Sequence, residues 1–157
     1  MANFTAAVLI FIFPLTWCAV LDLTCGVIPD KNHVLVFYGG LMLALMQPTG
    51  TALISLAAAA VFLGLSFAAA RLKKPVLGGA DVKLMAIITV CAGFAAALSA
   101  FMTAFVLAGI ASVAVKAADF LRRRFLKENS RPLLSKYGGG IPFAPFLLAG
   151  VCLYYSF

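Results

Sequence analysis

The stretch that decides the fold is residues 32–70, NHVLVFYGGLMLALMQPTGTALISLAAAAVFLGLSFAAA, which holds no Asp, Glu, Lys or Arg. A helix that crosses a bilayer needs about 20 mostly apolar residues, so this stretch is too long for one crossing. The turn-forming sequence QPTG lies inside it, at residues 47–50. We therefore expect two membrane helices here, over about Val34–Met46 and Thr51–Ala70.

Other uncharged runs flank this stretch, and each is long enough for a membrane helix: Met1–Leu21, Leu84–Val115 and Tyr137–Phe157. The second of these has room for two helices if it divides near residues 93–99. The prediction is an all-α fold, a polytopic membrane protein with six transmembrane helices in a single membrane-embedded domain, residues 1–157. The composition agrees, because 64% of the residues are hydrophobic and 11% are charged. In soluble domains about a quarter of the residues are charged.

All charged residues lie in three islands, Asp22–Lys31, Arg71–Lys83 and Lys116–Lys136. Lys and Arg outnumber Asp and Glu by 12 to 5, which gives a net charge of +7. Cytoplasmic loops of membrane proteins collect Lys and Arg, so the islands belong on the cytoplasmic side. Six spans place all three islands there, whereas five spans would not. The charge pattern therefore predicts that the N- and C-termini are both periplasmic.

This topology also bears on partners. A basic soluble domain would suggest nucleic acid, but here the membrane topology accounts for the charge, and we expect no nucleic-acid partner. The stretch Leu121–Ser130 is predicted to form a cytoplasmic basic helix. Its arginines, Arg122, Arg123 and Arg124, are suited to anionic lipid head groups, which we favour over a protein partner.

The sequence contains few residues that could bind a metal or a cofactor. The four cysteines form no C-x-x-C pair and His33 is the only histidine, so we expect no metal site and no cofactor. No phosphate-binding G-x-x-x-x-G-K-[ST] pattern occurs. A Ser-His or Cys-His site would have to use His33, which lies at the boundary of a predicted span and is assigned no role.

Two of the five carboxylates have an unusual placement. Asp22 closes the first predicted span and Asp81 opens the fourth, so both belong at the cytoplasmic edge of the membrane. An ionisable side chain there costs free energy unless it has a function or a partner, and Lys83 is the alternative partner for Asp81. Two neighbouring carboxylates share a proton, so the ionised one can activate water while the protonated one polarises a carbonyl. The pair predicts peptide hydrolysis by an aspartic dyad.

The residues before Asp81 fit such a site. Gly78 and Gly79 carry no side chains, so an extended substrate backbone can lie close to Asp81. A tight turn that precedes a helix explains the same glycines equally well.

Three motifs resemble those of the type IV prepilin peptidases. Residues 77–85, LGGADVKLM, resemble the family signature G-x-G-D-x-K-L-[LM]. Residues 22–30, DLTCGVIPD, resemble the first motif, an Asp followed six and seven residues later by an aliphatic residue and Pro, then Asn or Asp. Residues 139–146, GGIPFAPF, resemble the motif of the last span. The motifs occur in the family order, and the resemblance runs over nearly the whole chain.

The resemblance implies a six-helix aspartic protease of the bacterial inner membrane. Such enzymes cleave the leader peptides of prepilins and pseudopilins at the cytoplasmic face. Asp22 and Asp81 match the two catalytic aspartates, whereas Asp30 matches a position that is usually not catalytic. The signature motif implies that Gly78, Gly79, Ala80 and Lys83 contact the substrate.

The short chain resembles the Tad-type branch, which processes Flp-type pilins. Bifunctional relatives carry a large cytoplasmic domain, often with paired C-x-x-C motifs, and also methylate the new amino terminus. Neither feature is found in this sequence, so N-methyltransferase activity is not expected.

One position departs from the family pattern, because Ala80 stands where the family has its second glycine. If that residue must adopt a positive φ, activity is lost; if it must only be small, little changes. Two other functions are compatible with the sequence. One is a non-enzymatic membrane subunit of a pilus or secretion machine. The other is a small proton-coupled transporter, which the placement of both aspartates at one depth disfavours, since a conducting path needs groups at several depths.

The six-span topology predicts the location of reporter fusions. Fusions at Pro48 and Phe157 should read as periplasmic, and fusions at Lys74 and Lys127 as cytoplasmic. Paired alkaline phosphatase and green fluorescent protein fusions measure both outcomes. A cytoplasmic C-terminus would rule out six spans.

Overall fold

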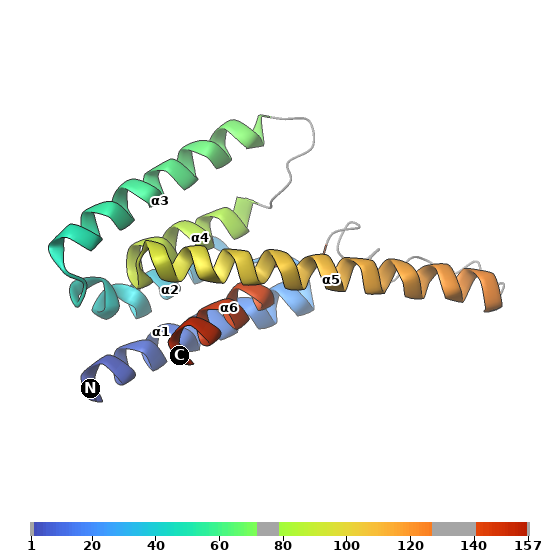
Figure 1. Cartoon of the computed structure of the whole chain (residues 1–157), viewed down its shortest axis with the longest axis horizontal. Helices are drawn as coiled ribbons and strands as arrows, with labels where there is room; N and C mark the ends of the chain where they lie inside the picture. Colours follow the sequence, from blue (N-terminus) through green and yellow to red (C-terminus); the bar gives the residue numbers. More distant parts are fainter. Residues whose placement is uncertain (1, 72–78, 127–140, 157) are drawn as a thin grey trace.

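The computed structural model describes residues 2–71, 79–126 and 141–156, and it contains helices without strands in these ranges (Figure 1). The helices are α1 (Ala2–Cys25), α2 (Asp30–Leu45), α3 (Thr49–Ala70), α4 (Gly79–Ala92), α5 (Phe94–Leu126) and α6 (Ala144–Ser156). This architecture confirms the predicted all-α fold.

Five of the helices form a closed ring. In the order α1, α2, α4, α5, α6, each helix packs on the next, and α6 packs back on α1. Helix α3 lies outside this ring, mainly against α4. Successive helices run back and forth along the long axis, so the N-terminus and α6's final turn lie at the same end (Figure 1). The opposite end holds the last turn of α1 and the first turns of α2, α4 and α6, and we call it the aspartate end.

Two glycines with positive φ set the helix boundaries. Gly26, with φ 69°, ends α1, and its N–H donates to the Asp22 backbone carbonyl at 2.9 Å. Gly93, with φ 95°, separates α4 from α5. Other residues reach this backbone region only with strain. The division predicted near residues 93–99 is therefore confirmed, and it falls on Gly93.

A polar network ties the helices together at the end opposite the aspartates. The Gln47 side-chain amide donates to the carbonyls of Val90 and Cys91, at 3.0 and 2.9 Å, where α4 ends. The Ser55 hydroxyl of α3 accepts from the Phe94 N–H at 3.1 Å, where α5 begins. Unsatisfied helix ends are costly in an apolar medium. Gln47 of the QPTG turn therefore caps the end of α4, and Ser55 of α3 caps the start of α5.

The outer surface of the bundle is apolar. Large hydrophobic side chains stay more than half exposed around it, among them Phe13, Leu45, Phe67 and Val113. Among the described residues, two helical segments are long and apolar enough to cross a membrane, Thr5–Cys25 and Phe94–Arg122. The segments Thr49–Leu65 and Ala144–Ser156 are apolar but shorter. Six crossings remain the prediction of the charge pattern.

Helix α5 is much longer than the prediction allowed. Its 33 residues extend about 50 Å at 1.5 Å per residue, which exceeds a hydrocarbon core of about 30 Å. The helix projects past the aspartate end of the bundle (Figure 1). The basic helix predicted at Leu121–Ser130 is, as far as Leu126, the continuation of α5 rather than a separate element. Residues 127–130 lie outside the described ranges.

The tightest helix contacts are at glycines. A Cβ atom on Gly40 of α2 would lie 2.5 Å from Cys91 Cβ in α4 and 2.8 Å from a ring carbon of Phe11 in α1. A Cβ atom on Gly150 of α6 would lie 2.6 Å from the Ala100 backbone in α5. Small residues let membrane helices approach this closely. These two contacts fix the spacing of the ring.

Gly150→Ala should therefore destabilise the protein. The added methyl collides with backbone atoms, which cannot rotate away, and overpacking of this kind costs about 1–3 kcal/mol. Gly109→Ala in α5 is the matched control, because its Cβ would meet nothing within 4 Å. Thermal unfolding in detergent micelles should show a lower midpoint for Gly150→Ala and an unchanged or higher one for Gly109→Ala. Equal midpoints would contradict the close contact.

Candidate active site

Asp22 is buried where the end of α1 meets the start of α6. It lies one turn before the end of α1, and only 8% of its surface is exposed. The backbone N–H of Ala144, the first residue of α6, donates to Asp22 Oδ2 at 3.0 Å. Helix N-termini offer unpaired N–H groups and a partial positive charge, so the carboxylate caps α6. The first motif is thereby joined to the last-span motif, which contains Ala144.

Asp81 lies in the first turn of α4 and is half-buried. An acidic residue at this position interacts favourably with the helix dipole. The residues that follow, Val82, Leu84 and Met85, are buried, and the last two belong to the central hydrophobic core. The core contacts of α4 therefore hold the segment that carries Asp81.

The residues before Asp81 can now be placed. Ala80 lies within α4, so its backbone is helical, and the requirement for a positive φ does not apply. A Cβ atom on Gly79 would meet nothing within 4 Å, so the space beside this residue is open. Gly78 lies outside the described residues.

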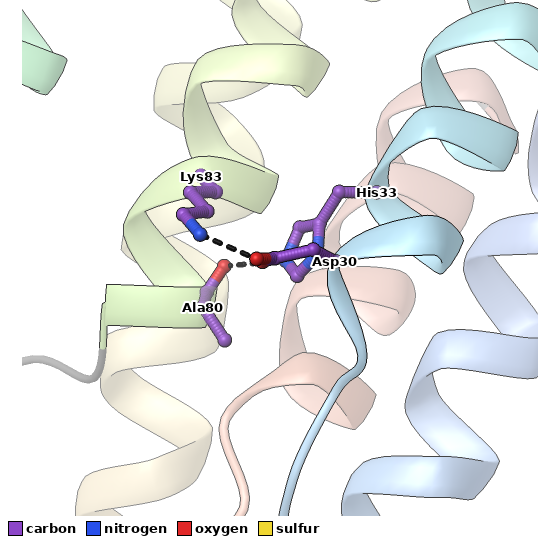
Figure 2. Close-up of polar contacts among 4 residues, drawn as sticks. All are labelled: Asp30, His33, Ala80 and Lys83. Carbon is purple, nitrogen blue, oxygen red and sulfur yellow. Dashed lines mark hydrogen bonds and ion pairs between the residues drawn. The ribbon is translucent and has the colours of Figure 1, made fainter.

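Two polar contacts join the first turn of α2 to the first turn of α4 (Figure 2). His33 Nε2 lies 3.0 Å from the Ala80 carbonyl oxygen. Lys83 Nζ lies 2.7 Å from Asp30 Oδ1 and forms an ion pair with it. His33 is only 5% exposed, whereas both side chains of the ion pair are more than half exposed. Lys83, considered above as a partner for Asp81, thus pairs with Asp30.

The ion pair changes the titration of Asp30. The hydrogen bond and charge of Lys83 lower the pKa of the Asp30 carboxyl below its ordinary value. The side chain of Asp30 is exposed, and Asp30 begins α2 and links that helix to the signature motif.

Helix α2 separates the two aspartates' helices and contacts both. It packs on α1, which carries Asp22, and on α4, which carries Asp81. Asp22 and Asp81 lie at the same end of the bundle, as their positions at the ends of the predicted spans indicated. Among the described residues no group of three or more His, Cys, Asp or Glu is arranged to hold a metal ion.

A groove of about 430 Å³ opens beside these contacts, between α2, α3 and α4. Its polar end is formed by Asp30, His33 and Lys83. Apolar side chains line the rest: Val34, Phe37, Tyr38, Leu63, Ala86 and Ile87. The groove thus runs from the signature motif along an apolar wall.

A model of the type IV leader peptidase family matches residues 9–113, more than half of the chain. The chain belongs to the type IV leader peptidase family. Membership indicates a membrane protease, and the matched region includes both Asp22 and Asp81. It ends before the last-span motif. No curated protein and no solved structure matches the chain.

Two residues of this candidate site were not predicted from the sequence. Ala144 contributes only a backbone N–H, which no side-chain pattern reveals. His33 was assigned no role, although it contacts the residue next to Asp81. A signal existed, because a lone histidine in a nearly uncharged run needs a polar partner when it is buried.

The ion pair yields a prediction for pH. In Lys83→Met the pKa of Asp30 should rise toward its ordinary value of about 3.9. Because the folded pKa is lowered, any contribution of the pair to stability is present above about pH 4 and is lost as the pH falls through the folded pKa. Carboxyl-carbon NMR titration measures the shift, and Asp30→Asn identifies the resonance. An unchanged titration in Lys83→Met would show that the pair does not form.

Proposed function

We propose that this protein is a prepilin leader peptidase. It is an aspartic endopeptidase that cleaves the leader from pilin or pseudopilin precursors at the cytoplasmic face of the bacterial inner membrane. The observation that carries this proposal is the family match over a region containing both Asp22 and Asp81. The fold supports it, since α1 and α4 carry these residues to the same end of the bundle.

The proposed chemistry needs only the two carboxyl groups and water. One carboxylate removes a proton from a water molecule, which attacks the scissile carbonyl carbon. The other, protonated carboxyl donates a hydrogen bond to the carbonyl oxygen and stabilises its developing negative charge. The proton taken from water then passes to the departing amine, and the C–N bond breaks. Two close carboxylates suit this task because they cannot both ionise easily.

The surroundings of Asp22 support its role. The side chain is buried, and the Ala144 N–H fixes one of its oxygens. The backbone of Phe143 also hydrogen-bonds to this carboxyl group, so two successive amides hold it. Catalytic groups on rigid helices are held more accurately than groups on loops.

The groove supports a substrate with an apolar segment. Its wall suits apolar side chains that follow the scissile bond, and its polar end lies beside Ala80 and Lys83, next to Asp81. A volume of about 430 Å³ accommodates a few side chains rather than a whole helix about 10 Å wide. In this proposal the substrate helix lies along the bundle and inserts side chains between α2 and α3. The backbone near the scissile bond passes the open side of Gly79.

The finer assignments rest on the sequence. The six-span topology, with both termini periplasmic, is proposed from the distribution of Lys and Arg. The Tad-type branch and its pilin substrates are proposed from the resemblance of this short chain to that branch. The topology agrees with a bundle in which the first turn of α1 and the last turn of α6 lie at the end opposite the aspartates (Figure 1).

The dyad is tested by isosteric substitution. Asp22→Asn and Asp81→Asn should each abolish leader cleavage, with a loss of at least about 10³-fold, because Asn cannot transfer a proton. The double variant should lose no more than either single one, since the pair acts as a unit. Co-expression with candidate prepilins, followed by the size shift of the pilin, measures cleavage.

Asp119→Asn in α5 is the matched control, because this carboxyl lies outside the motifs and the groove and the variant should retain activity. Membrane accumulation must be equal for all variants. Substantial cleavage by either Asp22→Asn or Asp81→Asn would exclude the aspartic mechanism. If the wild-type protein cleaves no prepilin but is required for pilus assembly, it is an assembly subunit.

A further inference from the structure

His33 holds the peptide bond that precedes Asp81. The carbonyl oxygen of Ala80 lies 3.0 Å from His33 Nε2 and belongs to the Ala80–Asp81 peptide group. A carbonyl can only accept, so Nε2 carries a proton and donates it. The peptide group is planar and includes the Cα atom of Asp81. A hydrogen bond to this oxygen therefore restrains the backbone from which the Asp81 side chain extends.

The hydrogen bond between His33 and Ala80 lies in a buried part of the molecule. His33 is 5% exposed, and its other nitrogen, Nδ1, is buried without a hydrogen-bond partner among the described residues. A buried polar atom without a partner is destabilising, so the burial of this ring is unfavourable apart from the bond that Nε2 makes. The neighbouring Lys83–Asp30 pair joins the same two helix turns, but it is exposed to solvent (Figure 2). Exposed ion pairs contribute little. The histidine bond is thus the stronger restraint between α2 and the signature motif.

We infer that His33 is a positioning residue for Asp81. Its hydrogen bond holds the first turn of α4 against α2. Helix α2 in turn packs on α1, which carries Asp22. The inference rests on the proposed function, in which Asp81 is one of the two catalytic carboxyls. His33 itself transfers no proton, because its donating nitrogen is engaged by the backbone. A displacement of about 1 Å at a catalytic group can lower a rate 10²-fold, so loss of this bond affects turnover.

A matched pair of substitutions tests this role. His33→Gln keeps a side-chain N–H₂ donor at a similar distance from the backbone, whereas His33→Met has nearly the same length and no donor. Both remove the ring, so the cavity that results is common to both. His33→Met should lower kcat by at least about 10-fold with KM little changed, and His33→Gln should retain most of the wild-type kcat. Cleavage of a purified prepilin in detergent or liposomes measures both constants.

The outcomes separate the possibilities. Equal kcat values for the Gln and Met variants, both near wild type, would overturn the inference. Loss of activity in both would also overturn it, because the imidazole itself would then be required. If the wild-type enzyme cleaves no prepilin, the proposed function fails instead.

A second measurement needs no activity. The chain has one histidine, so ¹⁵N-histidine labelling gives a single imidazole in the spectrum. In alkaline buffer, where free imidazole is neutral, the full-length protein in micelles should show a protonated Nε2 and a bare Nδ1. Asp81→Asn should leave this pattern unchanged, since the bond is to the backbone. A bare Nε2 would overturn the inference even if a His33 variant failed to accumulate.

Discussion

A buried carboxylate must find hydrogen-bond donors, and in this protein Asp22 finds one in the first amide of α6. This bond joins residues 122 positions apart in the chain. It closes the ring of helices at the aspartate end, where α6 packs between α1 and α5. It also satisfies a helix terminus that an apolar environment would otherwise leave unpaired. The same contact that stabilises the end of the bundle therefore fixes the orientation of a candidate catalytic group.

Helix α2 connects the helix that carries Asp22 to the helix that carries Asp81. It packs closely on α1 and α4, where Gly40 allows Phe11 and Cys91 to approach from either side. Its first turn then reaches the signature motif through His33 and Asp30. At the other end, the Gln47 side chain caps α4. Helix α4 is thus held at both ends, while α3, which lies outside the ring, leaves the groove beside it open. In the proposed function, this open groove receives the apolar segment of the substrate.

Much of this could be predicted from the sequence. The uncharged stretches gave all six helices, and the QPTG turn and Gly93 divided them correctly. The spacing of Asp22 and Asp81 from the ends of their helices was enough to predict that both lie at the same end. The family match confirmed the family that the motifs suggested, and it covers the first motif and the signature motif. Alanine at position 80 raised a question about backbone conformation, and a helical residue there answers it. These features are local or follow from length and charge, which a sequence states directly.

The contacts that build the site could be decided only by the tertiary structure. Soluble helices show an apolar stripe that predicts which face turns inward. Here nearly every face of each helix is apolar, because the outer surface meets lipid, so no periodicity indicates which residues are neighbours. Nothing in the sequence therefore paired His33 with Ala80, Lys83 with Asp30, or Asp22 with the amide of Ala144. The sequence by itself determined which stretches form apolar helices and at which end the aspartates lie, although α5 continues past its predicted end. The packing of one helix against another decided which polar groups meet, since each buried donor and acceptor must be satisfied across helices rather than along the chain.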